Sequence, residues 1–238
     1  MRSLFLSAAT AICLLSITES QAALIDRGGG LIYDTDLNIT WLQDANYAKT
    51  SGYTDILYPY PSGSSGSMAW SQASTWVANL VYHDSVRNVD YDDWRLPSTT
   101  DIGAPGCDYA YSGTDCGDNV DPVSSEMAHL FFVELGNKSF YDTFGNRQSG
   151  SGLVNTGPFI NFQYSIYLSG TDYAPDTTRE WLFDFGYGEQ YYFQKTDTLY
   201  ALAVRPGDVA AVPEPEMWVL MLSGLTLVGI TARRRKAR

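Results

Sequence analysis

The sequence has few of the residues on which most catalytic sites depend, with 2 histidines and 3 cysteines among 238 residues. Serine hydrolysis needs a base beside the nucleophile. Only His83 and His129 are available for that role, and no Gly-x-Ser-x-Gly motif occurs. A catalytic zinc site needs three protein ligands, and the two histidines stand in no recognisable metal motif. The scarcity argues against these classes of enzyme.

Basic residues are also scarce between the two ends of the chain. Residues 23–212 hold 9 Lys+Arg against 24 Asp+Glu, a net charge of −15. Nucleic acid is itself a polyanion, so it is not expected as a partner. The acids leave one catalytic alternative open, a pair of carboxylates that cleaves a glycosidic bond. Apart from that alternative, the sequence predicts no catalytic residue, no metal site and no cofactor.

The N-terminus has the layout of a secretory signal peptide, cut after Ala22 or Ala23. Arg2 supplies a positive charge, Leu4 to Ile17 is an apolar run, and small residues precede the cut. Cys13 leaves with this peptide. The sequence therefore predicts a signal peptide at 1–22 and an exported domain at 23–208.

Export decides how the two remaining cysteines are interpreted. Cys107 and Cys116 stand close together in "GCDYAYSGTDCGD". Two cysteines in an exported chain predict one disulfide, which stabilises the fold by roughly 2–3 kcal/mol on the chain-entropy model. Four acids lie in or beside this loop: Asp108, Asp115, Asp118 and Asp121. They are interpreted as solvated loop residues, with a calcium site as the alternative.

The C-terminus predicts a membrane segment. Residues 217–232 carry no charge, and as a helix they are roughly 24 Å long, a little short of a hydrocarbon core of about 30 Å. The basic end at 233–238 follows at once and is expected to stay in the cytoplasm. Its first four residues form the basic stop: Arg233, Arg234, Arg235 and Lys236.

A linker at 209–216 precedes this segment and contains Pro213, Glu214 and Pro215. The prolines hold the chain extended. "VPEPEMWVLMLSGLTLVGITARRRK" resembles the PEP-CTERM sorting signal of Gram-negative bacteria. The resemblance implies that an exosortase recognises the Pro-Glu-Pro triplet and removes the tail. It also implies an inner-membrane-anchored precursor that moves to the cell surface or matrix of an exopolysaccharide-producing bacterium.

The middle of the chain predicts an α+β domain. Strands are expected on either side of a turn at 34–38, and again between 162 and 207, where the segment around Trp181 alternates with a period of two. Asp34, Asp36 and Asn38 imitate the start of an EF-hand loop, but the required glycine and closing glutamate are missing.

Helical spacing predicts two helices. The first covers 68–81, follows a loop at 52–67, begins with Ser67 as N-cap and buries Trp76. The second covers 124–135. His129 lies off its apolar stripe and is expected to be exposed.

The segment "DDWRLPS" (92–98) lies between these helices. Trp94 and Leu96 are expected to be buried there. Arg95 is expected to form a structural ion pair with an acidic neighbour rather than to bind a ligand.

Five segments, in order, resemble the Lcl C-terminal domain family: "GLIYDTDLNITWLQDANYA", "MAWSQASTWVANL", "DDWRLPS", "IYLSGTDYAPDTTREWLFDFGYG" and "YALAVRPGD". The resemblance implies a C-type-lectin-like fold, related to the formylglycine-generating enzymes, with a twisted antiparallel sheet. The family often has tryptophan where this chain has Leu168, so that position is either a core position or a ligand contact.

Together these patterns predict a surface or matrix protein without catalytic activity that binds exopolysaccharide or acts as an adhesin. Its 17 tyrosines suit sugar rings, although tyrosines also fill cores and strands. Two alternatives remain: a structural component that contacts other proteins without sugar specificity, and a glycan-processing enzyme.

Overall fold

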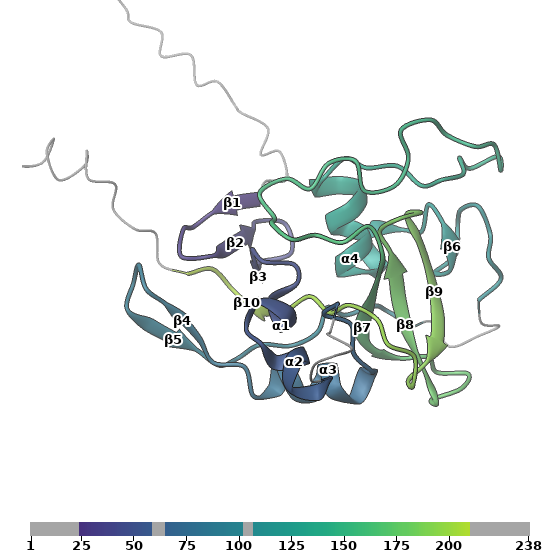
Figure 1. Ribbon diagram of the computed structural model, residues 1–238. Helices are drawn as coiled ribbons and strands as arrows, with labels where there is room; N and C mark the ends of the chain where they lie inside the picture. Colours follow the sequence, from purple (N-terminus) through teal and green to yellow (C-terminus); the bar gives the residue numbers. More distant parts are fainter. Residues whose placement is uncertain (1–23, 59–64, 102–106, 210–238) are drawn as a thin grey trace, which may run out of the picture.

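Two four-stranded antiparallel sheets form the frame of the domain (Figure 1). The computed structural model describes residues 24–58, 65–101 and 107–209. The first sheet has the order β1-β2-β3-β10 and the second the order β6-β9-β8-β7. The strands of the first are β1 Leu24–Asp26, β2 Leu31–Asp34, β3 Ile39–Leu42 and β10 Val204–Pro206. Those of the second are β6 Gly117–Asp118, β7 Ile166–Asp172, β8 Arg179–Asp184 and β9 Glu189–Gln194.

The first sheet joins the two ends of the domain. β10 pairs with β3, so a strand from near residue 205 lies beside one from near residue 40. Arg27 and Asp208 form an ion pair across the same region. A separate hairpin, β4 Tyr82–Asp84 with β5 Val89–Tyr91, projects from the side opposite β6 and β9 (Figure 1).

Short helices surround the sheets. They are α1 Tyr47–Thr50, α2 Tyr53–Leu57, α3 Trp70–Ala78 and α4 Glu126–His129. α4 follows a 3₁₀ turn at Pro122–Ser124 and continues directly into a π-helical turn at Leu130–Glu134. The Ser125 hydroxyl caps α4 by accepting a hydrogen bond from the Ala128 N–H.

The main core lies where the two sheets meet the α4 segment. Trp41 from the first sheet, Phe131 from the π turn and Phe183 from the second sheet are fully buried members of it. A second core, containing Trp76, Trp94 and Leu96 as predicted, lies under α3. Leu168 is fully buried in this second core. The position at which the family often has tryptophan is therefore a packing position in this chain.

The α+β prediction is confirmed, and so are the strands on either side of the 34–38 turn and in the C-terminal part of the domain. β8 differs in one respect, because Glu180, Trp181, Leu182 and Phe183 are all buried. A period of two separates a buried face from an exposed one only when one face of the sheet meets water, and both faces of β8 are covered.

Both predicted helices are present, the first as α3 and the second as α4 with its π turn. Their number was wrong, because the described residues contain four α-helices. α2 lies inside the segment expected to be a loop, where burial of Thr54 outweighs the local composition. α3 begins after Ala69 rather than Ser67, and the Gln72 side chain accepts the hydrogen bond of the Ala69 N–H. Val81, the last residue of the predicted helix at 68–81, is exposed beyond the end of α3.

Candidate functional site

Two series of aromatic rings lie in the region of β6, β9 and the loops beside them. We call them together the tyrosine strip and define it as Tyr109, Tyr111, Phe140, Tyr141, Tyr187 and Tyr192. Tyr109, Tyr111 and Tyr187 are 54%, 44% and 47% exposed. Large apolar rings gathered on a surface mark a binding site more often than scattered ones do.

Ring contacts link the members of the strip in two series. Tyr111 contacts Tyr141, with centroids 5.4 Å apart, and Phe140 contacts both Tyr141 and Tyr187 at 5.0 and 5.3 Å. In the other series Tyr109 contacts Tyr192 at 6.5 Å. Tyr192 in turn stacks at 4.0 Å on the buried Tyr173. The two series meet in the loop that carries Tyr109 and Tyr111.

This loop is fixed by the disulfide between Cys107 and Cys116, which confirms the predicted pairing. The Asp118 N–H donates to the Ala110 carbonyl, at 2.9 Å. Gly117 has a φ of +99°, and a side chain there would meet the Ala110 oxygen at 2.1 Å. The Asn119 amide donates to the carbonyls of Tyr111 and Tyr141. The disulfide and these hydrogen bonds therefore fix the backbone of the loop that carries the exposed rings of Tyr109 and Tyr111.

Three of the four acids of this region accept hydrogen bonds from the loops themselves. Asp108 accepts from the Ala110 N–H and the Thr114 hydroxyl, and Asp121 accepts from the Val123 N–H. Asp118 is buried and accepts from the Tyr141 N–H. In the described part of the chain these acids do not form a set of three converging metal ligands.

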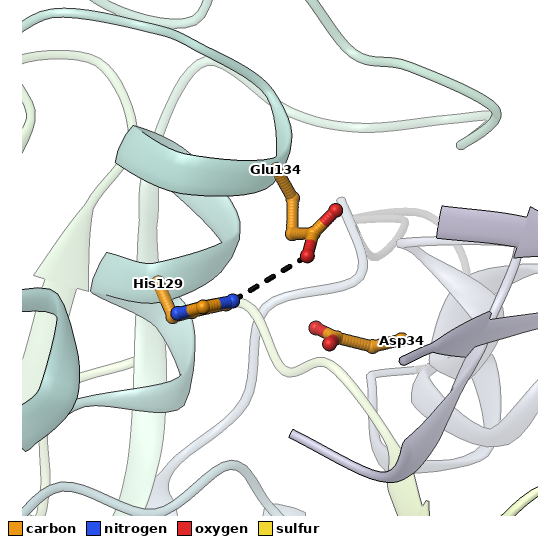
Figure 2. A group of neighbouring side chains, drawn as sticks. All are labelled: Asp34, His129 and Glu134. Atoms are coloured by element: carbon orange, nitrogen blue, oxygen red, sulfur yellow. Dashed lines mark ion pairs between the residues drawn. The ribbon is translucent and has the colours of Figure 1, made fainter. Parts of the chain in front are cut away.

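A second polar feature lies inside the molecule, between the first sheet and the α4 segment. We call Asp34, His129 and Glu134 the His129 cluster (Figure 2). One ligand atom from each residue lies within 4.8 Å of the other two, and Figure 2 shows the three side chains pointing toward one another. His129 Nε2 is 3.4 Å from Glu134 Oε1.

The prediction of an exposed His129 was wrong, since this residue is only 9% exposed. The π turn explains the cluster. In an α-helix, residues five apart point about 140° away from each other. Here the Leu135 N–H donates to the Leu130 carbonyl, a bond between residues five apart. The wider turn brings His129 and Glu134 to the same side, which α-helical spacing does not predict. Turns of this kind are frequent at functional sites.

Asp34 comes from the turn that imitates an EF-hand start. Its Oδ1 accepts from the N–H groups of Asp36 and Leu37, which closes the turn between β2 and β3. Its Oδ2 lies 3.4 Å from the indole nitrogen of Trp41. In the sequence, Asp34 stands out only as part of an incomplete EF-hand pattern. The structure places its side chain beside His129.

Burial dominates the electrostatics of the cluster. It raises the pKa of Asp34, against the hydrogen bonds from the turn and the attraction of His129. Burial also raises the pKa of Glu134, and the neighbouring Asp34 carboxylate raises it further. Glu134 Oε1 and His129 Nε2 are buried, and neither has a hydrogen-bond partner among the described residues.

Arg95 behaves as predicted. Its guanidinium donates two hydrogen bonds to the two carboxylate oxygens of Glu126, at 2.7 and 2.6 Å. Glu126 also accepts from the Ser98 N–H. This pair ties the 94–98 segment to the start of α4, and Glu126 therefore serves the fold rather than the His129 cluster.

The predicted sorting residues lie outside the described residues. This applies to the signal peptide, to Pro213, Glu214 and Pro215, to the segment 217–232 and to the basic stop at 233–236. Among the residues that the structure describes, none of the helices is both long and apolar enough to cross a membrane.

The chain thus combines a mixed helix-and-sheet domain with a C-terminal sorting segment. It belongs to the Lcl C-terminal domain family, whose profile matches residues 30–205. The PEP-CTERM protein-sorting motif matches residues 211–236. This motif implies an exported protein that is anchored in the membrane before an exosortase processes it. No curated protein and no solved structure matches the chain, so the C-type-lectin-like fold stays a prediction.

Proposed function

We propose that the exported domain is a non-catalytic surface or matrix protein that binds exopolysaccharide through the tyrosine strip. The strip carries this proposal because three of its rings are exposed, and because a disulfide closes the loop that carries two of them. An aromatic face is electron-rich, so it attracts the polarised C–H groups on the face of a sugar ring. A row of such faces suits a polymer of sugars better than a single small molecule.

The net charge of the domain indicates which kind of polysaccharide it binds. The part of the chain between the signal peptide and the sorting tail carries a net charge of −15, from 9 Lys+Arg and 24 Asp+Glu in residues 23–212. Like charges repel a polyanion before contact. We therefore infer an uncharged polysaccharide. Two cations lie over the rings, the Arg147 guanidinium over Phe140 and the Arg179 guanidinium over Tyr192, where they can donate to sugar hydroxyls.

The test compares the full-length protein with a double variant, Tyr109→Ser/Tyr111→Ser, by calorimetry against exopolysaccharide from the producing cells, a neutral glucan and a polyuronate. Two exposed rings at about 1 kcal/mol each predict about thirty-fold weaker binding. Tyr91→Ser is the matched control, because Tyr91 is in β5, on the opposite side of the molecule (Figure 1).

Equal losses in the control and the double variant would contradict a site on the strip. Cleavage of the polymer would favour the glycan-processing alternative instead. Cross-links on intact cells to proteins alone, without any polysaccharide binding, would favour the structural alternative.

The sorting step has its own test. Pro213→Ala/Pro215→Ala should leave an unprocessed precursor in the inner membrane, because the Pro-Glu-Pro triplet is what the exosortase is expected to recognise. Immunoblots of fractionated cells measure this. Unchanged size and location would remove the role of the triplet and leave the binding proposal standing.

A further inference from the structure

The His129 cluster contains two carboxylates and one imidazole in a space almost closed to water. Glu134 has a side chain that is 1% exposed, and Asp34 is fully buried. Buried carboxylates are costly unless cations or hydrogen bonds offset them. A single histidine offers at most one positive charge for the two acids.

The contact between His129 and Glu134 does not resolve this imbalance. Their atoms are 3.4 Å apart, and both remain without a hydrogen bond in the described part of the chain. That separation is unfavourable for a hydrogen bond but matches two ligands of one ion. Donors about 2.0–2.1 Å from a tetrahedral zinc ion lie about 3.3–3.4 Å apart.

The surroundings resemble the supports of a metal site. Backbone N–H groups of the turn orient the Asp34 carboxylate, as outer hydrogen bonds do for metal ligands. Asp36 lies at the outer edge, with Oδ2 3.9 Å from His129 Nε2 and a side chain that is 38% exposed. It offers a fourth ligand atom, a carboxylate oxygen, and marks the side from which an ion enters.

We propose that Asp34, His129 and Glu134 bind one divalent transition-metal ion of the zinc type, with Asp36 or water as the fourth ligand. One nitrogen and a few carboxylate oxygens suit such ions. Calcium takes six to eight oxygens, more than these residues supply. The bound ion links the β2–β3 turn to the π turn, two segments nearly a hundred residues apart in the sequence.

The experiment uses the full chain, purified in mild detergent without a polyhistidine tag and freed of metal with a chelator. Calorimetric titration at neutral pH should show one equivalent of Zn²⁺ bound and no comparable binding of Ca²⁺ or Mg²⁺. Co²⁺ should give the visible absorption of a tetrahedral site. The melting temperature should rise with Zn²⁺, because an ion that binds only the folded state stabilises it.

His129→Gln and Glu134→Gln should each weaken Zn²⁺ binding by about 100-fold or more, while His83→Gln is the matched control. His83 also contacts an acid, Asp90, but lies on the surface of the β4–β5 hairpin. Circular dichroism in chelator shows whether each variant folds. If one does not, Asp36→Asn takes its place, and we expect a smaller loss of Zn²⁺ affinity for it. Absence of Zn²⁺ uptake by the folded parent, or equal losses in His83→Gln, would overturn the proposal.

Discussion

The tyrosine strip and the His129 cluster are built in opposite ways. The strip exposes large rings on loops that a disulfide and backbone hydrogen bonds hold in place. The cluster encloses charged groups between a sheet and a π turn. An open row of rings has room for a polymer, whereas an enclosed set of charges has room for an ion. The two proposed sites therefore differ in burial as well as in residue type.

The two histidines test the effect of burial most strongly. His129→Ala removes the imidazole that faces two buried carboxylates and should lower the free energy of unfolding by about 3–5 kcal/mol, as the loss of one partner of a buried pair does. His83→Ala removes a pair whose histidine is 56% exposed and should change it by less than about 0.5 kcal/mol. Urea unfolding in chelator measures both. Similar costs for the two variants would remove the distinction between buried and exposed histidines.

Reducing the disulfide should affect the strip more than the cluster. Loss of the Cys107–Cys116 bond should cost about 2–3 kcal/mol of stability and weaken polysaccharide binding, because Tyr109 and Tyr111 lie within the loop it closes. Calorimetry with and without dithiothreitol, under conditions where the domain stays folded, measures the second effect. Reduction that leaves polysaccharide affinity unchanged would show that the loop does not position the rings.

Glu180 is a buried acid outside the His129 cluster, so it tests the effect of burial on a carboxyl group without a neighbouring histidine. It is fully buried on β8, both of its carboxylate oxygens lack hydrogen-bond partners within the described ranges, and burial raises its pKa from 4.5 to about 7. A raised pKa in the folded state favours folding at low pH, and this contribution is lost as pH rises through about 7.

Glu180→Gln should therefore stabilise the protein by about 1–3 kcal/mol at pH 8 and have little effect near pH 4.5. Unfolding curves across this pH range measure it. Glu126→Gln is the control, and it should be destabilising, because Glu126 loses charge-assisted hydrogen bonds from Arg95. A pH-independent effect of Glu180→Gln would show that this carboxyl keeps its ordinary pKa.

The smallest expected effect is a cross-test of the two sites. Tyr109→Ser/Tyr111→Ser should leave the rise in melting temperature caused by Zn²⁺ unchanged, and Glu134→Gln should leave polysaccharide affinity unchanged. Distant sites with no shared partners usually act independently. A loss of both activities in either variant would mean that the strip and the cluster form one site.

Local patterns were enough to predict β2, β3, the C-terminal strands and the burial of Trp76, Trp94 and Leu96, and export with two remaining cysteines predicted the disulfide. β1, the β4–β5 hairpin and β6 were not predicted, because these segments are only two or three residues long. The Arg95 ion pair was also predictable as a class, although its partner was not. The sorting motif could be identified because its order of residues is specific in itself.

The His129 cluster could not be predicted in this way. The α-helical spacing assumed for 124–135 separates His129 from Glu134, and only the π turn brings them together. Asp34 reaches them through tertiary packing across about a hundred residues of sequence. The tyrosine strip could not be predicted either, because the composition gives the number of tyrosines but not which of them are exposed.

The most direct test of the account is hydrogen–deuterium exchange of the full-length protein with and without the neutral polysaccharide. We predict slower exchange in the peptides that carry the tyrosine strip, around residues 107–119, 140–147 and 187–193, and no change in the β4–β5 hairpin. Protection confined to the hairpin or to α3, or no protection at a polysaccharide concentration that gives binding heat, would contradict a binding site on the strip.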